Sequence, residues 1–287
     1  MNVLSDQEQK CQSNTILHRV AVVSESGQML GYGRVVSGPW DPGTSPGDFN
    51  FVILVAKEWR KSGIGKHIYD HILQFSKQNG AKRLSTFVYE TEQEQLNWLE
   101  RLGFAKSIHT FNSVLDLQKF DPHSFSTTLQ SVRSTGLKFA TLADYPDTDE
   151  MFSRFFDVMM ELTSDVPNAD RMQFPDFDTM KYICKHMAPW EPSAIQLIVD
   201  DHRWVAMSVL TRMPDQWYNC VLTGVDRDYR GRGLALAVKV KSAEYAKNNG
   251  GQFIRTYNDS TNDRILRVNQ RMGFAAQPGQ YTLDKMV

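Results

Sequence analysis

Residues 220–236 read CVLTGVDRDYRGRGLAL, and residues 50–66 read NFVILVAKEWRKSGIGK. Each stretch is an apolar run that leads through a charged segment to an arginine and a glycine-containing turn. A short apolar run is typical of a buried strand, and the residues after each turn have helical periodicity. Both stretches therefore predict a strand, a tight turn and a helix, in that order.

The two turns belong to a longer internal repeat. Arg60 and Arg230 are 170 positions apart, and each lies 44 residues before the phenylalanine of a Gly-Phe pair. An ungapped alignment of residues 55–105 with residues 225–275 has 13 identical positions out of 51. Ordinary residue frequencies give about three. We interpret the repeat as a duplicated structural unit.

The local patterns agree between the copies and predict the fold class. Each copy is expected to contain a strand, a helix and a second strand, at 51–55, 65–78 and 83–88 and again at 220–225, 235–248 and 253–257. Alternating apolar residues predict a preceding hairpin in each copy, at 16–23 with 29–36 and at 194–199 with 204–210. The predicted fold is a mixed α/β architecture (α+β mixed sheet): two tandem domains, each a mixed antiparallel and parallel sheet flanked by helices.

The domain boundary is predicted from a polar stretch at residues 118–135, which we interpret as a linker. The first domain is then residues 1–124 and the second is residues 125–287. The second copy opens with an expected strand at 137–142 and an expected helix at 147–163. Since the offset of 170 would carry these elements to negative residue numbers, the first domain is predicted to lack its opening strand and helix.

Composition excludes several classes of function. The 32 Lys and Arg residues nearly cancel the 33 Asp and Glu residues, so no global positive field attracts nucleic acid or an anionic membrane. The N-terminal sequence MNVLSDQEQKCQ is not a secretory signal, and no apolar run approaches the ~20 residues of a membrane span. A cytoplasmic protein is expected. The three cysteines, Cys11, Cys184 and Cys220, have neither disulfide nor zinc spacing.

The turns are candidate anion sites. Missing side chains let the backbone approach a ligand, and successive N–H groups at a helix start can hold a diphosphate. Nucleotide motifs fit poorly, because Ile68 and Leu236 replace the third glycine of GxGxxG and the first turn lacks the Gly-Lys-Ser/Thr ending of a phosphate loop. The alternative is that each glycine serves only a tight connection from strand to helix. The occurrence of two such turns in the same context makes this alternative less economical.

The Arg-x-x-Gly-x-Gly/Ala turn and the downstream Gly-Phe pair resemble the GNAT superfamily of acyl-CoA N-acyltransferases, twice and over most of the chain. The resemblance implies acetyl-CoA as cosubstrate, held by the turn and by the preceding strand, and no metal. By motif position it assigns coenzyme binding in the second copy to Val225, Arg230, Gly231, Arg232, Gly233, Leu234, Ala235 and Asn262. In the first copy it assigns the same role to Val55, Arg60, Lys61, Ser62, Gly63, Ile64 and Gly65.

The resemblance also favours the second copy as the catalyst. The family's helix asparagine is matched by Asn262 but by Glu92 in the first copy, and the family's proton-donating tyrosine is replaced by Leu99 and Asn269. The acidic segment 161–178 is absent from the first copy in recognisable form. Glu161 and Asp165 are therefore the candidate catalytic residues for accepting a proton from the acceptor amine; a solvated acidic loop is the alternative.

Competing interpretations remain at this stage. His67 and His71 have metal-ligand spacing on a helix, but no H-E-x-x-H motif accompanies them. A covalent role for Cys220 competes with simple packing. The expected activity is transfer of an acetyl group to a primary amine of a small molecule or peptide, and the rival is a non-catalytic module that binds coenzyme A. The sequence leaves the acceptor and the oligomeric state open.

Overall fold

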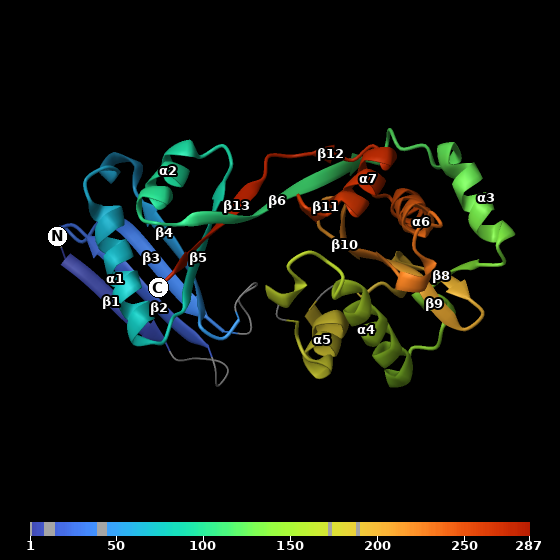
Figure 1. Cartoon of the computed structure of the whole chain (residues 1–287), viewed down its shortest axis with the longest axis horizontal. Coiled ribbons are helices and arrows are strands. Elements are labelled where there is room, and N and C mark those ends of the chain that lie inside the picture. Colours follow the sequence, from blue (N-terminus) through green and yellow to red (C-terminus); the bar gives the residue numbers. More distant parts are fainter. Residues whose placement is uncertain (1, 9–14, 39–44, 172–173, 188–189) are drawn as a thin grey trace. The chain divides into compact units, whose positions relative to one another are not determined.

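The computed structural model describes residues 2–8, 15–38, 45–171, 174–187 and 190–287 (Figure 1). Contacts divide the chain into two compact units. Unit 1 consists of residues 1–109, 170–174 and 280–287, and unit 2 consists of residues 110–169 and 175–279. Each unit has its own hydrophobic core, and the strands of both units are ordered in one continuous mixed sheet.

Unit 1 is a mixed sheet with a helix packed on it. Its strands follow the order β1 (Asn2–Glu8), β2 (Ile16–Val23), β3 (Met29–Ser37), β4 (Asp48–Val55), β5 (Arg83–Tyr89) and β13 (Gln280–Met286). Strands β4 and β5 are parallel, whereas the other neighbours are antiparallel. Its helices are α1 (Ile64–Gln78) and α2 (Gln93–Arg101), with a short 3-10 turn η1 (Lys57–Trp59) before α1.

Helix α1 lies across β2, β3 and β4 through an apolar stripe (Figure 1). Its buried residues include Ile64, Ile68 and Ile72, which recur every four positions and so lie on one face. A Cβ atom at Gly33 would lie 2.4 Å from Ile68 Cγ2, so the strand below this helix has room only for glycine there. This close packing fixes the start of α1 next to the end of β4.

Unit 2 has a sheet of similar design with helices on both faces. Its strands follow the order β6 (Ala105–Asp116), β11 (Phe253–Asp259), β10 (Trp217–Val225), β9 (Arg203–Arg212), β8 (Ile195–Asp200) and β7 (Lys138–Thr141), with β12 (Ala275–Ala276) paired to β6. Strands β10 and β11 are parallel. The α-helices are α3 (Ser126–Ser134), α4 (Asp149–Thr163), α5 (Phe177–Tyr182), α6 (Leu234–Asn248) and α7 (Asp263–Met272). Shorter helical segments are η2 (Pro122–Phe125), η3 (Leu142–Asp144), η4 (Ala169–Arg171), η5 (Ile183–Met187), η6 (Pro192–Ala194) and η7 (Arg227–Tyr229).

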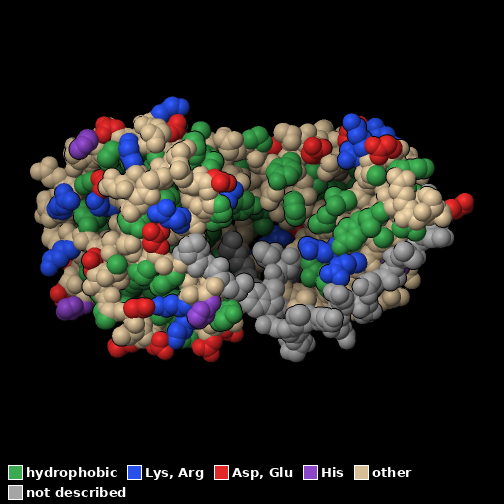
Figure 2. Space-filling view, turned by 180° about the vertical axis from the view of Figure 1, so that it is seen from behind, with side chains coloured by type: hydrophobic (Ala, Val, Ile, Leu, Met, Phe, Trp, Pro, Cys, Tyr) green, Lys and Arg blue, Asp and Glu red, His purple; other side chains and the backbone are tan. Residues whose placement is uncertain are grey.

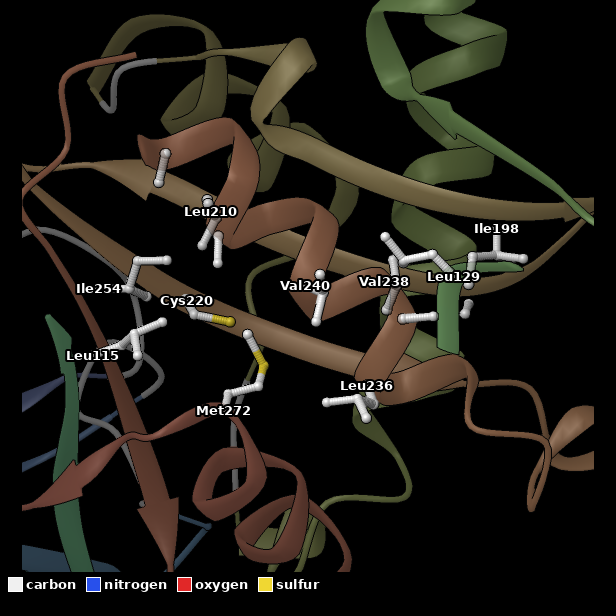
Figure 3. Close-up of a cluster of buried hydrophobic side chains, with 14 of the residues drawn as sticks. Leu115, Leu129, Ile198, Leu210, Cys220, Leu236, Val238, Val240, Ile254 and Met272 are labelled. Carbon is white, nitrogen blue, oxygen red and sulfur yellow. The ribbon is translucent and has the colours of Figure 1, made fainter. Parts of the chain in front are cut away.

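Two hydrophobic clusters occupy the two faces of the sheet in unit 2. One contains most of α6 together with Leu129, Ile254 and Met272, and Figure 3 shows Cys220 and Met272 pointing toward one another within it. The other contains α4, with Phe152 and Phe155 among its buried residues. Helix α6 is therefore a central, almost fully buried element, and the glycine-containing turn at its start is held firmly in place.

The two copies exchange their last strands. Residues 110–116 of the first copy belong to unit 2 and pair with β11, beginning with Thr110 opposite Asp259. Residues 280–286 of the second copy belong to unit 1 and pair with β5, beginning with Gln280 opposite Tyr89. The repeat offset of 170 relates Thr110 to Gln280 and Tyr89 to Asp259, so the two pairings are equivalent. The exchange is thus reciprocal and keeps the same register.

Two sequence-based expectations for the first half of the chain are corrected. The first copy was expected to lack an opening strand, but β1 pairs antiparallel with β2, as β7 does with β8. Residues 118–135 were expected to form only a linker, yet they contain α3, which buries Leu129 and Val132 against the core of unit 2. Two apolar residues within nine give too weak a periodicity to predict this helix.

The compact units also differ from the predicted division at residue 125. Unit 2 begins at Thr110 and unit 1 recovers residues 280–287, because contacts follow strand pairing and not the order of the repeat. The assignment of residues 1–124 and 125–287 to two ancestral copies stays a prediction. No helix in the described ranges is long and apolar enough to cross a membrane.

Acidic and basic side chains are interspersed on the face shown in Figure 2. This pattern agrees with the formal net charge of −1. No large field of one sign is visible on that face.

Candidate functional site

The two glycine-containing turns have the same backbone conformation. Arg60 and Arg230 are extended, with φ of −66° and −67°. The next residue has positive φ in both turns, 64° at Lys61 and 79° at Gly231. Gly63 and Gly233 then precede the helices with φ of 89° and 76°. A side chain at either glycine would meet open space, so the constraint there is the left-handed backbone and not crowding.

Each turn leaves a row of backbone donors exposed at a helix start. The first helical hydrogen bonds run from His67 N to Gly63 O, 3.0 Å, and from Ala237 N to Gly233 O, 3.1 Å. Within the described part of the chain, the N–H groups of residues 61–66 and 231–236 have no acceptor. Such a row, at the positive end of a helix dipole, is suited to a phosphate group.

Arginine side chains tie each turn to the end of the preceding strand. The Nε atoms of Arg60 and Arg230 donate to the carbonyls of Val55 and Val225, at 3.3 and 3.2 Å. The carbonyls of Val55 and Val225 thus anchor their own turns. In unit 2 the guanidinium of Arg232 also donates to the Asp228 carbonyl at 3.1 Å, which holds this cation beside the turn.

The parallel strands separate just before each turn. In unit 2 the ladder between β10 and β11 ends at the pair Cys220 and Thr256, whereas β10 remains paired with β9 as far as Val225. In unit 1 the ladder between β4 and β5 ends at Asn50 and Ser85. A V-shaped gap between two parallel strands exposes backbone groups that a linear ligand with amide groups can bind.

A β-bulge distinguishes the gap in unit 2 from the gap in unit 1. The register of β9 with β10 shifts between Cys220 and Leu222, which leaves Val221 as the extra residue. The pairing of β3 with β4 has no such shift in the described residues. Bulges re-aim side chains and end strand pairing next to active sites. Val221 itself is 58% exposed.

The two gaps also differ in what covers them. In unit 2 the end of α4 lies directly over β10, because a Cβ atom at Gly224 would be 2.8 Å from the Cβ atom of Leu162. The repeat places Leu54 at the corresponding position of unit 1, and its side chain is 61% exposed. Unit 2 therefore has a wall on this side of the gap, formed by the helix that carries Glu161.

The structure places the two candidate catalytic carboxylates differently. Asp165 receives three hydrogen bonds from Arg227, the shortest at 2.7 Å, and is also paired with Arg230. These guanidinium groups, Arg227 foremost, hold the pKa of Asp165 below its ordinary value, so its carboxylate is a weakened base. Glu161 is exposed one helical turn earlier. The hydrogen bond and charge of Asp165 raise the pKa of Arg227, and the nearby charge of Glu161 adds a smaller contribution in the same direction.

The remaining predicted residues have local roles in the structure. Asn262 caps helix α7 by accepting a hydrogen bond from Ile265 N, at 3.4 Å. Leu234 and Ile64 are buried and begin their helices. Ser62 donates to the Trp59 carbonyl at 2.6 Å.

Two further residues of the first turn, Lys61 and Gly65, have exposed or loosely packed surroundings near the start of α1. Lys61 forms an exposed ion pair with Glu94, at 3.0 Å. A Cβ atom at Gly65 would make only ordinary contacts, the closest at 3.7 Å from Val55. The alanine at the equivalent position 235 is therefore consistent with the same backbone.

Sequence reasoning missed a polar chain at the point where β10 and β11 separate. Thr256 donates to the Cys220 carbonyl at 3.3 Å. Asn258 donates to the Thr256 carbonyl at 3.3 Å and accepts a hydrogen bond from Asn269, at 2.8 Å. Asn269 in turn accepts one from the buried Lys239, at 2.6 Å. The sequence held one signal for this polar chain, namely that Thr256 is identical to Thr86 at the equivalent position of the repeat.

Other candidate sites give little support to different chemistry. No group of three or more potential ligand side chains in the described residues could hold a metal ion. His71 Nε2 instead lies 3.1 Å from His18 Nε2. A cavity of about 270 Å³ in unit 2 is lined by Tyr145, Phe152 and Trp190, and none of the predicted site residues lines it. Cys220 is buried within the core of unit 2.

Comparisons with known proteins agree with this geometry. The model of the acetyltransferase (GNAT) family matches residues 4–104 and 157–274, which is more than half of the chain and includes both turns. A search among curated proteins found no significant match.

Solved structures show the same fold at low sequence identity. A GCN5-related N-acetyltransferase from Sphaerobacter thermophilus aligns with a TM-score of 0.68 and 16% identity, over 93% of this chain and 80% of that chain. A tandem GNAT protein from the clavulanic acid biosynthesis pathway aligns with a TM-score of 0.65 and 16% identity, over 96% and 84%. A glucosamine N-acetyltransferase region of a fungal multi-domain protein aligns with a TM-score of 0.67 and 12% identity, over 93% and 33%.

Proposed function

The chain belongs to the GNAT acetyltransferase family, and from that premise we propose that it transfers an acetyl group from acetyl-CoA to a primary amine of a small molecule or peptide, with unit 2 as the catalytic unit. The observation that carries the proposal is the combination found in unit 2 of a donor row at residues 231–236, a gap between β10 and β11, and a bulge at Val221.

The residues present fit coenzyme A. The diphosphate would accept hydrogen bonds from the N–H groups of residues 231–236, and Arg232 would add positive charge beside it. The backbone of β10 beyond Cys220 would bind the amide groups of the pantetheine arm. Acetyl-CoA supplies an activated acyl group when bound, and the N–H groups of this strand would polarise the thioester carbonyl.

Unit 2 is the better candidate for catalysis because its gap has a wall and a carboxylate. Helix α4 covers Gly224 and brings Glu161 to the same side of the sheet. Glu161 would attract a cationic amine and accept its proton directly or through water. We assign Asp165 to holding Arg227 and Arg230, and we propose that unit 1 binds coenzyme A through residues 61–66 without catalysing transfer.

The experiment is a comparison of one substitution in each turn. Gly233→Asp puts a carboxylate and a strained side chain into the turn of unit 2, and Gly63→Asp does the same in unit 1. Acetyl-CoA binding is measured by calorimetry, and release of the coenzyme thiol is measured with a panel of amines. We expect Gly233→Asp to abolish turnover and Gly63→Asp to leave it within about twofold. The reverse pattern contradicts the assignment to unit 2.

A non-catalytic module that binds coenzyme A is the second candidate. The observation that favours it is the orientation of Asn269, which occupies the family's tyrosine position but is 2% exposed and bonded to Lys239 and Asn258. No phenol therefore reaches the gap from this position. Coenzyme binding without thiol release for any amine in the panel supports this second function.

A further inference from the structure

An aliphatic and an aromatic side chain are exposed at the apex of the gap in unit 2, where β10 and β11 separate. Cys220 and Thr256 are the last residues that pair across the two strands, and paired strands lie about 4.8 Å apart. The next residue is Val221 on β10 and Tyr257 on β11, with exposed fractions of 58% and 55%. Apolar side chains beside a proposed reaction site are candidate contacts for the substrate.

Tyr257 faces the side of the sheet on which α4 lies. Side chains alternate along a strand, and Ile254 belongs to the core cluster that contains α6 (Figure 3). Tyr257, three residues later, therefore faces the opposite side. Asp259 shares the face of Tyr257 and accepts a hydrogen bond from Asn168 at 2.8 Å. Because Asn168 lies in the segment that follows α4, this contact agrees with the assignment of the face.

The bulge in β10 brings Val221 to the same face. Cys220 belongs to the core cluster around α6, whereas Leu222 belongs to the cluster around α4. Since Val221 follows Cys220 directly, alternation turns its side chain toward α4, and the bulge leaves Leu222 on that face as well. Leu222 is buried in the core, and Val221 stays outside it. In unit 1, where the described strand pairs have no bulge, the equivalent Phe51 is buried.

A hydrogen bond restricts the ring of Tyr257. Its hydroxyl lies 2.6 Å from the hydroxyl of Thr110, which belongs to β6, the strand that the first copy contributes to unit 2. The repeat places Phe87 at the equivalent position of unit 1, where the ring is 52% exposed and has no hydroxyl. A ring that is already held loses less conformational entropy when a ligand packs against it. The surface at the apex is therefore partly preorganised.

We propose that Val221 and Tyr257 select the acceptor, an inference that names the substrate class of the function proposed above and rests on it. A coenzyme arm that begins at the turn and follows β10 toward Cys220 ends at the apex, between these two side chains. An amine attracted to Glu161, on the helix that covers the same face, would lay its carbon skeleton on Val221 and on the ring of Tyr257. The acceptor class is a primary amine with an apolar body, aliphatic or aromatic, and not an amino sugar or a hydroxylated amine.

The first test compares ethanolamine, n-butylamine and 2-phenylethylamine, which have increasing apolar surface. In the wild type we expect kcat/KM for 2-phenylethylamine to exceed that for ethanolamine by about tenfold or more, as for an apolar group that enters a matching site. Tyr257→Ala should lower this ratio about tenfold and Val221→Ser about threefold, with KM for acetyl-CoA within about twofold. Both residues are exposed, so both variants should fold.

Two matched variants separate the ring from its hydroxyl and unit 2 from unit 1. Tyr257→Phe keeps the ring but loses the bond to Thr110, so the ratio should stay within about threefold of the wild type. Phe87→Ala removes the equivalent exposed ring of unit 1 and should leave the ratio unchanged. An unchanged ratio in Tyr257→Ala contradicts the inference, and so does a loss that occurs in Phe87→Ala instead.

Amine binding without turnover separates this inference from the proposed function. 2-Phenylethylamine is titrated by calorimetry into each protein in the presence of coenzyme A, which carries no acyl group to transfer. We expect binding to weaken about tenfold in Tyr257→Ala and to stay unchanged in Phe87→Ala. This pattern without thiol release from acetyl-CoA for any amine supports the acceptor surface and refutes the proposed transfer. Thiol release without preference among the three amines, or absence of amine binding to the wild type, refutes the inference.

Discussion

At the residue scale, the two candidate carboxylates differ in their surroundings, and the roles proposed for them differ accordingly. Glu161 is exposed and close to Arg227, whereas Asp165 is paired with Arg227 and Arg230. We expect Glu161→Gln to lower kcat on the order of 10²-fold, as for loss of a general base, and Asp165→Asn to leave kcat within about threefold. Steady-state kinetics of both variants with one amine decide between them, and a larger loss in Asp165→Asn would reverse the roles.

The pairing of Asp165 has a consequence for stability at low pH. Its arginine partners lower the pKa of the folded-state carboxylate below the ordinary value of 3.8. A lowered pKa means that the charged form stabilises the fold at pH above 3.8, and that this contribution is lost as pH falls through the lower folded value. Asp165→Asn should therefore melt at lower temperature than the wild type at pH 7, and the difference should diminish as pH falls below 3.8 through the lowered folded-state pKa. A difference independent of pH contradicts this account.

At the element scale, the contact of α4 with β10 depends on the absence of a side chain. A Cβ atom at Gly224 would lie 2.8 Å from Leu162 Cβ and 3.0 Å from its Cδ1. Gly224→Ala should therefore destabilise unit 2 by about 1–3 kcal/mol, as expected for overpacking. Leu162→Ala added to Gly224→Ala should restore part of the loss. Leu54→Ala at the exposed equivalent position should change stability by less than about 0.5 kcal/mol. Chemical denaturation of the four proteins measures these differences.

The elements near the turns could be predicted from the sequence, because their signals are local. The helix expected at 235–248 is observed as α6, Leu234–Asn248, and the strand expected at 16–23 is observed as β2. The turn residues follow from a glycine pattern that occurs twice. The bulge at Val221 and the chain from Lys239 to Asn258 depend on how strands and helices pack in three dimensions, and no residue spacing along the chain reports that.

At the scale of the whole molecule, local sequence patterns also do not predict which neighbouring strand a given strand pairs with. Residues 280–286 alternate as a strand in either sheet, yet they pair with β5 and not with β11. The hydrogen bonds of the half-buried Lys285 explain the choice. Lys285 donates to the Leu102 carbonyl at 2.7 Å and to the Tyr69 hydroxyl. Joined to β11 instead, the repeat would bring the Lys285 amine toward the buried Lys239 amine, and each would disfavour the protonated form of the other.

In unit 2, β6 carries different side chains at the positions equivalent to Lys285 and Leu283, and these fit the contacts of β11. The repeat relates Lys285 to Leu115 and Leu283 to Ser113. Ser113 Oγ accepts a hydrogen bond from Asn258 at 3.0 Å, whereas a leucine there would leave that buried amide without its partner. The exchange of strands is therefore encoded by complementary side chains, one set in each unit, and not by the connection lengths alone.

A fragment of residues 125–287 tests this account, because it lacks residues 110–116 and must use its own strand beside β11. We expect the fragment to be unfolded or strongly destabilised, and the double substitution Leu283→Ser, Lys285→Leu to restore a cooperative transition by reproducing the side chains of Ser113 and Leu115. In the full chain the same double substitution removes the buried Leu283 and the contacts of Lys285, and should destabilise unit 1 by about 3 kcal/mol or more. Thermal unfolding followed by circular dichroism compares all four proteins. Equal stability of the two fragments would mean that the side chains at these positions do not select the sheet.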